Sequence, residues 1–416
     1  MSGKARMLSA LVLGVMVLSL VSPGWSGAPV KPVEIEVWHR WSGSNQEALV
    51  GVLREFEKKQ PNIAVKELGQ AGEYIDLLQR MLANMAAGKQ PPDLFIGGYN
   101  LMNYIGTEMK PTPMDQAGGA DAQEVYKRFD PAVLKLGFFG GKQIGLPFAL
   151  SNIVLYYNAD LFKAAGLKAD APPKTWDEVV TVSKTIKDKT GKYPIVVQKI
   201  DNWSDQALIF SNGGKLLSDD GKCVAFNNPQ AVDAYQMWAG LHKAGLAPKG
   251  TEEELMGSFT GGGIAMYATT IMRLASFRTQ AKFELGVAPM PAFTGKPKAL
   301  PGGGAAIMIF SKDPAKQKAA WEVAKYLVSE EGMRSWTKTG YLPVVKGNIP
   351  VPKGQEVAYA QMPNAVPWMS WPGGSTGLEI DKLFLDARTK IIYGELDAKG
   401  GLDKAAATAN ALLGCK

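Results

Sequence analysis

The chain has 416 residues with a formal net charge of +7, and 46% of its residues are hydrophobic, as is usual for a globular protein. Because single hydrophobic cores stop growing at about 250–300 residues, this length predicts two lobes instead of one. The basic residues are spread along the chain without clustering, which argues against a nucleic-acid partner.

The first residues have the order of a secretory signal peptide. Lys4 and Arg6 precede an apolar run at 7–21, and small residues follow it. The run is shorter than the about 20 apolar residues that span a bilayer comfortably. We expect cleavage near Ser26, so that residues 1–26 are removed and the mature chain is secreted into the periplasm. No cysteine lies near this point, so we expect no lipid anchor.

Strand and helix patterns alternate along the mature chain. The alternating segment 33–38 predicts a strand, and the pair Ser44 and Glu47 has the capping-box spacing of a helix start. The same order recurs, with strands expected at 63–65, 92–96, 153–157, 193–197 and 306–310 and helices at 74–85, 176–187 and 314–328. This alternation predicts an α/β fold with mostly parallel sheets covered by helices.

Loops that follow the predicted strands are the first places to look for a binding site. In open α/β sheets, ligands bind outside the carboxyl ends of the strands. In this chain, the rule indicates loops 39–44 and 97–100 and the segment around Trp203.

Two cysteines, Cys223 and Cys415, are present in the whole chain. An oxidising compartment would allow them to form one disulfide. Sequence separation does not show whether their Cα atoms lie within bonding distance, so both states stay open.

Several motifs occur in one order along nearly the whole mature chain. They are Trp38-His39, the segments 91–95, 146–148, 155–158 and 172–176, Gly263-Ile264-Ala265-Met266, Gly302-Gly303-Gly304-Ala305 and Lys338-Thr339-Gly340-Tyr341-Leu342-Pro343. With this ordered set the chain resembles the family-1 extracellular solute-binding proteins of ABC importers. Within them it is most similar to the glycerol-3-phosphate-binding and maltose-binding group.

The resemblance implies a two-lobed type II periplasmic binding protein fold of α/β class, with the ligand in a hinged cleft. It implies chain crossovers near 144–150 and 287–293, and we expect a monomer that needs no cofactor. A ligand that contacts both lobes stabilises the closed state, which a membrane permease then recognises. The expected lobes are 27–146 plus 292–330 at the amino-terminal side, and 147–291 plus 331–416 at the carboxy-terminal side.

Candidate contacts in the first lobe include aromatic and polar residues in the loops after strands, namely His39, Trp41, Ser44, Tyr99 and Asn100. The resemblance adds Tyr74, which matches a family position near the ligand at the start of a helix. Tryptophan faces bind the apolar faces of sugars, and imidazole and indole N–H groups donate to hydroxyls. Other roles stay open for several of them. Ser44 would equally serve as a helix cap, Tyr74 as part of a core stripe, and Asn100 as a turn residue.

The resemblance adds further contacts: Ser151, Asn152, Trp203, Thr270, Gly303, Gly304, Tyr341 and Trp371. Trp203 would form a platform opposite Trp41, or else belong to the core. Gly303 and Gly304 would let backbone N–H groups approach the ligand, since they lack a Cβ atom. Trp371 lies with Trp368 in a Pro/Gly-rich loop, where a cleft rim and packing on the second lobe are equal alternatives.

Two charged candidates bear on the ligand's charge. Arg273 has a planar fork that binds phosphate or carboxylate in a bidentate manner, with a surface ion pair as the alternative. Glu379 stands where the glycerol-phosphate branch of the family carries an arginine. The phosphate assignment therefore requires that Arg273 replace that arginine. Glu379 itself suits hydroxyls or a cationic group better than a phosphate.

The predicted function is therefore that of a substrate-binding subunit that captures an extracytoplasmic carbohydrate for an ABC permease. The alternative is binding of glycerol-3-phosphate or a related phosphodiester, for which Arg273 is the candidate. A secreted glycosidase is disfavoured because no carboxylate pair or catalytic motif stands out. A ferric-binding protein would use adjacent tyrosines such as Tyr156 and Tyr157, but this pair lies in a strand segment that sugar-binding members share. We expect no metal.

Overall fold

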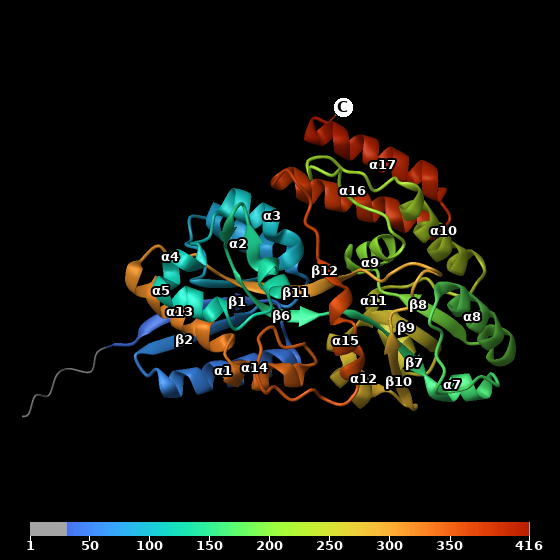
Figure 1. The fold of residues 1–416 in the computed structure, drawn as a ribbon, viewed down its shortest axis with the longest axis horizontal. Helices are drawn as coiled ribbons and strands as arrows, with labels where there is room; N and C mark the ends of the chain where they lie inside the picture. Colours follow the sequence, from blue (N-terminus) through green and yellow to red (C-terminus); the bar gives the residue numbers. More distant parts are fainter. Residues whose placement is uncertain (1–30, 416) are drawn as a thin grey trace, which may run out of the picture.

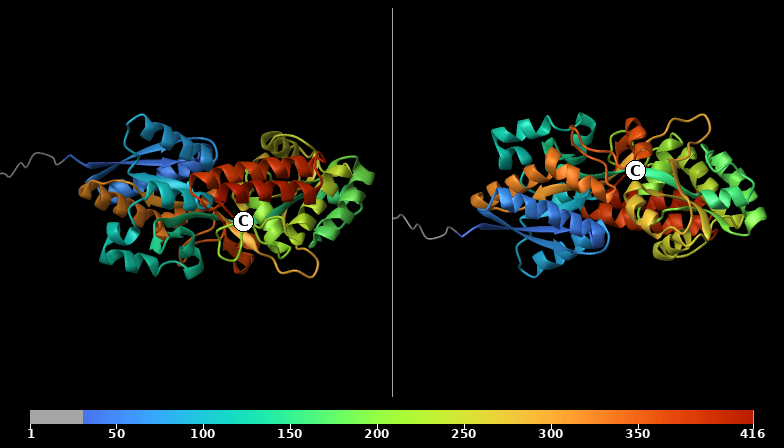
Figure 2. Two further views of the ribbon diagram at one scale, coloured as in Figure 1. Left: turned by 90° about the horizontal axis from the view of Figure 1, so that it is seen from above. Right: turned by 90° about the horizontal axis from the view of Figure 1, so that it is seen from below.

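The computed structural model describes residues 31–415, so the predicted signal peptide and its cleavage site lie outside the described residues. Two lobes lie side by side along the long axis of the molecule, and each has its own sheet and helices (Figures 1 and 2). This is the expected two-lobed α/β architecture. No helix within residues 31–415 has both the length and the apolar character that crossing a membrane requires.

The sheet of the first lobe has six strands. In it, β1 pairs in parallel with β2 and β3, whereas β11 pairs antiparallel with β3 and β6 and parallel with β12. The strands are β1 (Val33–His39), β2 (Ile63–Gly69), β3 (Leu94–Gly98), β6 (Leu146–Ser151), β11 (Leu300–Ile309) and β12 (Ala365–Pro367). A short hairpin is formed by β4 (Phe138–Phe139) and β5 (Lys142–Gln143).

The sheet of the second lobe is β10-β7-β9-β8, and only its β8–β9 pair is parallel. Its strands are β7 (Ile153–Asn158), β8 (Tyr193–Val197), β9 (Ile264–Thr270) and β10 (Leu285–Pro289). Both sheets are thus mixed. The first is mostly parallel as expected, with three parallel pairs out of five, whereas two of the three pairs in the second are antiparallel. Each antiparallel pair includes at least one of β6, β7, β10 and β11, which are the strands on either side of the two crossovers between the lobes. Except in the β11–β12 pair, a strand that the chain forms just before or after a crossover runs opposite to its neighbours in the sheet.

Helices cover both sheets. In the first lobe they are α1 (Gly43–Lys59), α2 (Tyr74–Ala86), α3 (Met102–Tyr104), α4 (Met114–Gly118), α5 (Ala120–Tyr126), α6 (Pro131–Leu134), α13 (Pro314–Leu327) and α14 (Glu330–Trp336). In the second they are α7 (Ala159–Ala164), α8 (Trp176–Thr190), α9 (Trp203–Ser211), α10 (Pro229–Lys243), α11 (Glu252–Thr260), α12 (Leu274–Gln280), α15 (Glu356–Ala360), α16 (Ser375–Ile392) and α17 (Ala398–Leu413).

The start of α1 differs from the prediction by one or two residues. The helix begins at Gly43, with Ser42 as its extended N-cap residue, and Ser44 is exposed within the first turn. The apolar face of the helix is buried as its periodicity predicts, through Leu49, Val52, Leu53 and Phe56.

The chain connects the lobes at points that differ from the expected boundaries. Strand β6, which includes residues 147–151, pairs in the sheet of the first lobe, and the crossing follows at Asn152. The helix α14 packs against α1 in the first lobe, although residues from 331 onward were expected in the second. Later, α15 contacts β7 and β10, β12 returns to the first sheet, and α16 packs on α10.

A disulfide joins Cys223 to Cys415, with Cα atoms 6.0 Å apart. It ties the end of α17 to the loop that precedes α10, on the outer side of the second lobe (Figure 1). The sequence had left this pairing open.

Candidate ligand-binding cleft

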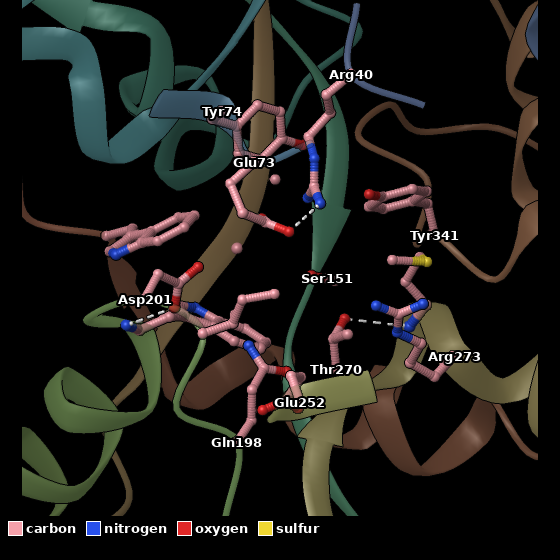
Figure 3. Close-up of a pocket in the computed structure, with 16 residues that line it drawn as sticks. Arg40, Glu73, Tyr74, Ser151, Gln198, Asp201, Glu252, Thr270, Arg273 and Tyr341 are labelled. Atoms are coloured by element: carbon pink, nitrogen blue, oxygen red, sulfur yellow. Dashed lines mark hydrogen bonds and ion pairs between the residues drawn. The ribbon is translucent and has the colours of Figure 1, made fainter. Parts of the chain in front are cut away.

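A cleft lies between the two lobes at the carboxyl ends of several strands. Its hollow measures about 500 Å³, including space that is open to solvent. Arg40 follows β1, Ser151 ends β6, Gln198 follows β8 and Thr270 ends β9, as the rule for α/β sheets predicts. The other lining residues are Glu73, Tyr74, Ile200, Asp201, Trp203, Glu252, Met272, Arg273, Gly303, Gly304, Tyr341 and Trp368 (Figure 3).

An ion pair forms the wall of the cleft on the first lobe. The guanidinium of Arg40 lies 2.7 Å from a carboxylate oxygen of Glu73 and donates from Nε to the carbonyl of Gly72 over 2.8 Å. It also lies 4.8 Å from the ring centroid of Tyr74. Burial raises the pKa of Glu73, while the positive charges of Arg40 and Arg273 act against this rise. Three contacts therefore fix the orientation of Arg40.

Tyr341 contributes an aromatic face whose position is set by the core behind it. Its ring stacks on Trp336 with centroids 5.1 Å apart, and its hydroxyl accepts a hydrogen bond from Trp41 Nε1 over 3.0 Å. Trp41 itself is only 4% exposed. The aromatic cluster thus presents Tyr341 to the cleft and keeps Trp41 out of it.

A carboxylate and two indoles lie together on the opposite wall. Asp201 accepts the backbone N–H of Trp203 over 2.9 Å at the start of α9. Trp203 donates from Nε1 to the carbonyl of Pro301, and Trp368 donates from Nε1 to Asn202 Oδ1, both over 2.7 Å. The two indole rings have centroids 6.2 Å apart. Because protein acceptors take both indole N–H groups, the rings have only their carbon edges and faces left for a ligand.

The carboxyl of Asp201 is strongly perturbed. Burial raises its pKa to about 7, the Trp203 N–H counteracts this rise, and the nearby charges of Glu73 and Asp381 add to it. Such a shift on a group that lines a cleft is typical of functional positions.

The segment that carries Asp201 is held from behind by a buried arginine on α16. Arg388 donates to the backbone carbonyls of Lys199 and Asp201 over 2.8 and 3.1 Å. It also forms an ion pair of 3.0 Å with Asp205, and both side chains are at most 5% exposed. Three fixed partners make Arg388 a support for this wall of the cleft.

Arg273 differs from Arg40, the other arginine that lines the cleft. Its guanidinium forms no ion pair with any residue of the segment 31–415 that the structure describes. Thr270 accepts the backbone N–H of Met272 and so caps the short turn that carries Arg273. The guanidinium is therefore available to a ligand.

Two glycines that line the cleft are needed for packing. A Cβ atom on Gly303 would come within 2.8 Å of the Trp203 ring, and one on Gly304 would come within 2.0 Å of the carbonyl oxygen of Ala149. Gly304 also has a φ of +130°, which favours glycine. The two glycines thus allow Trp203 and β6 to pack closely against β11, in addition to any backbone contact with a ligand.

Half of the sequence-predicted contacts line this cleft: Tyr74, Ser151, Trp203, Thr270, Arg273, Gly303, Gly304 and Tyr341. The other half lie elsewhere: His39, Trp41, Ser44, Tyr99, Asn100, Asn152, Trp371 and Glu379. For most of the second group, a specific partner explains the placement.

His39 is completely buried, where it contacts Glu67 and accepts the backbone N–H of Trp41. Tyr99 donates its hydroxyl to the carbonyl of Ala149, which places it in the core. Asn152 donates to the carbonyl of Ala358 at the crossover between the lobes.

Trp371 and Asn100 line a separate, smaller hollow of about 260 Å³. Trp371 donates there to Asp381 over 2.7 Å. Glu379 is exposed on α16 and Ser44 on α1, and neither faces the cleft.

Sequence reasoning missed four charged residues of the site, Arg40, Glu73, Asp201 and Glu252, and the neutral amide of Gln198. Arg40 and Asp201 stand in or beside the very loops that the strand-end rule indicated, and Glu73 precedes the predicted Tyr74. Charged residues in loops usually lie in solvent, so the pattern alone gave no reason to select them. Among residues 31–415, no three His, Cys, Asp or Glu side chains are grouped to hold a metal ion.

Comparison with known proteins agrees with this geometry. The sn-glycerol-3-phosphate-binding periplasmic protein UgpB of Yersinia pestis bv. Antiqua (strain Antiqua) is 28% identical over 357 residues, or 80% of this chain and 78% of that protein. The UgpB of Pectobacterium atrosepticum is 27% identical over 431 residues, covering 95% of this chain and 94% of that protein.

Solved structures share the two-lobed fold. The cyclic α-maltosyl-1,6-maltose binding protein from Arthrobacter globiformis has a TM-score of 0.77 at 26% identity, covering 92% of this chain and 99% of that one. UgpB from Mycobacterium tuberculosis in complex with glycerophosphocholine has a TM-score of 0.80 at 20% identity, covering 92% and 98%. The family model of bacterial extracellular solute-binding proteins matches residues 42–334, which is more than half of the chain. The chain belongs to this family of bacterial extracellular solute-binding proteins.

Proposed function

We propose that the cleft binds a small hydroxylated solute, a carbohydrate or polyol, and that the protein delivers it to the permease of an ABC importer. The observation that carries this proposal is that aromatic rings and hydrogen-bonding groups from both lobes meet in one hollow. Tyr341 and Trp203 offer faces and edges for the apolar side of a sugar. Ser151, Gln198 and Thr270 offer partners for its hydroxyls.

Binding in this position would couple the ligand to lobe closure. A solute between Tyr341 on one lobe and Gln198 on the other contacts both lobes only when they are close together. Its binding energy then favours the closed state, in proportion to its differential affinity for that state. A permease that recognises the closed form would receive loaded protein in preference to empty protein.

A phosphorylated polyol is the second candidate. The observation in its favour is the guanidinium of Arg273, which has no ion-pair partner within the described part of the chain. The curated relatives named above also bind sn-glycerol-3-phosphate. The carboxylates of Asp201 and Glu252 in the same cleft oppose a ligand whose charge is only negative.

The cellular context is part of the same proposal. Removal of residues 1–26 near Ser26, with no cysteine there for a lipid anchor, would release the mature chain into the periplasm. We expect the protein to act as a monomer and to bind its solute without chemical turnover.

A thermal-shift screen tests the ligand class directly. The secreted protein is refolded from denaturant to remove carried-over solute, then mixed separately with maltose, sorbitol and glycerol-3-phosphate. A ligand at 100 times its Kd stabilises the folded state by about 2.7 kcal/mol, which is readily visible in Tm. Carbohydrate binding predicts a shift with maltose or sorbitol, lost in Tyr341→Ala and kept in Glu379→Gln. A shift with glycerol-3-phosphate alone, lost in Arg273→Ala, would support the second candidate instead.

A further inference from the structure

The cleft contains more carboxyl groups than arginines, although the whole chain has a net charge of +7. Two arginines, Arg40 and Arg273, stand against three carboxyl groups, Glu73, Asp201 and Glu252, so that the sum is 2 − 3 = −1 when all three are ionised. Burial raises the pKa of Asp201 to about 7, so a cation beside it would favour its ionised form. Because Arg40 and Glu73 pair at 2.7 Å, one unpaired arginine remains with two further carboxylates. A neutral polyol would offer no positive charge to Asp201 or Glu252.

Two of these carboxyl groups lie where the lobes face each other. Glu73 from the first lobe and Asp201 from the second border the same open space (Figure 3). One carboxylate oxygen of Asp201 accepts the Trp203 N–H, and its other oxygen has no hydrogen-bond partner among residues 31–415. Burial raises the pKa of Asp201, and the charge of Glu73 on the other lobe adds to this rise.

The surroundings of Asp201 suit a cation better than a hydroxyl group. The indoles of Trp203 and Trp368 lie beside it with their N–H groups already donated to Pro301 and Asn202. The electron-rich face of an indole attracts ammonium groups, and this attraction strengthens when water is excluded. A carboxylate with a free oxygen beside two such rings can neutralise a positively charged nitrogen.

The other end of the cleft has the opposite sign. Arg273 lies across the open space from Asp201, near Tyr341 (Figure 3). Hydroxyls or an anionic group fit that end. The two ends of the cleft thus differ in the sign of their charged groups, and an uncharged sugar would gain no binding energy from this difference.

We propose that the natural solute carries a positively charged nitrogen, as an amine or quaternary ammonium, in addition to its hydroxyl groups. Asp201 and Glu73 hold this nitrogen from the two lobes, beside the indoles of Trp203 and Trp368. The proposal rests on the proposed function, since it requires that the solute bind in this cleft. It also gives the ligand a role in closure, because a cation contacts a carboxylate from each lobe only when the two lobes are close together.

Pairs of probes that differ in this nitrogen test the proposal by isothermal titration calorimetry at neutral pH. The pairs are N-methylglucamine with sorbitol, glucosamine with glucose, and glycerophosphocholine with glycerol-3-phosphate. In at least one pair, the positively charged member should bind about tenfold or more tightly than its partner. The three pairs separate a polyol, a sugar and a phosphodiester as carriers of the nitrogen.

Asp201→Asn is the main variant, because the amide oxygen can still accept the Trp203 N–H and preserve the start of α9. It should abolish the preference for the charged member and leave the affinity for the uncharged member within about threefold. Glu73→Gln should reduce the preference in the same direction. Glu379→Gln, on the exposed side of α16, removes a carboxylate outside the cleft and should leave both affinities unchanged.

The outcomes separate this proposal from the one on which it rests. One contrary outcome is that the charged and uncharged members of each pair bind with equal affinity. Another is that Asp201→Asn weakens the binding of both members by the same factor. Either outcome would mean that Asp201 acts as a hydroxyl acceptor. In that case the nitrogen proposal fails while carbohydrate or polyol binding stands. If no member of any pair binds and maltose does not bind either, both proposals fail.

Discussion

The indole N–H of Trp41 donates to the hydroxyl of Tyr341 over 3.0 Å, and this bond joins residues that are 300 positions apart in the chain. Tyr341 also stacks on Trp336, which in turn stacks on Phe148 with centroids 4.7 Å apart. The tyrosine that lines the cleft is therefore the outermost member of an aromatic cluster in the core of the first lobe. Its ring is positioned before any ligand arrives.

We predict that Tyr341→Phe lowers the free energy of unfolding by about 1–3 kcal/mol. The change keeps the ring but leaves the buried N–H of Trp41 without its acceptor, and an unsatisfied buried donor costs this much. Urea unfolding measures the effect. Tyr193→Phe is the matched control, because Tyr193 is 42% exposed and should change stability by less than about 0.5 kcal/mol. Equal effects at the two positions would show that the Trp41–Tyr341 bond contributes nothing.

Asp201→Asn is expected to stabilise the ligand-free protein at high pH. Between the pKa of an unfolded aspartate and about 7, the carboxyl ionises in the unfolded state and stays protonated in the folded one. Folding stability therefore falls as pH rises through this window, and the full cost remains above it. The groups that face Asp201 and enter this balance are Glu73 and Asp381, which raise its pKa, and Arg40, which lowers it.

The difference in unfolding free energy between Asp201→Asn and the wild type should reach at most about 4 kcal/mol near pH 8 and fade toward about pH 4. Guanidinium unfolding at a series of pH values gives this curve. Glu379→Gln, an exposed carboxylate on α16, should show no such trend. A constant difference at every pH would mean that the Asp201 carboxyl does not titrate in the folded protein near neutrality.

Loss of the Cys223–Cys415 disulfide should lower the free energy of unfolding by about 2–4 kcal/mol, because the bond restricts an unfolded chain over 192 residues. Unfolding with and without a reducing agent measures the change. The double variant Cys223→Ser with Cys415→Ser should match the reduced protein and should not respond to the reductant. Hydrogen exchange should increase most in α17, which the bond anchors; unchanged exchange there would contradict the prediction.

Arg388→Ala should destabilise the protein by about 3–5 kcal/mol, since it leaves Asp205 buried without its partner. Ligand affinity should fall as well, because the carbonyls of Lys199 and Asp201 lose their support. Lys382→Ala on the same helix is the control. Lys382 pairs with Asp386 at the surface, where solvent screens the pair, so its removal should leave stability close to that of the wild type. An Arg388→Ala variant that is as stable as this control would rule out the supporting role.

The strand and helix pattern predicted the α/β class well, because alternating and helical periodicities are local properties of the chain. The position of Trp41 could not be predicted in this way. Its loop indicated a cleft residue, but its indole N–H finds an acceptor that only tertiary folding brings close. His39 is similar, since its buried partner Glu67 lies on the neighbouring strand β2.

Trp41 and His39 were predicted in the cleft but lie in the core, whereas Asp201 lines the cleft but was not predicted there. Its place after a strand fitted the rule for ligand sites, yet an isolated aspartate in a loop gives no sign that Trp203 and Trp368 will enclose it. Burial creates the property that distinguishes this residue, and burial depends on contacts between distant segments. Aromatic residues were easier to select because their chemistry is the same wherever they lie.

The division of the sheets between chain segments sets an order of assembly for the two lobes. All four strands of the second sheet come from one continuous stretch, β7 to β10, which ends at Pro289. The first sheet begins with β1 but requires β11 and β12, and β12 ends only at Pro367. A chain exported amino-terminus first would therefore complete the second sheet while the first still lacks two strands. Because distant pairings carry the larger entropic cost of loop closure, the first lobe should be the last to fold.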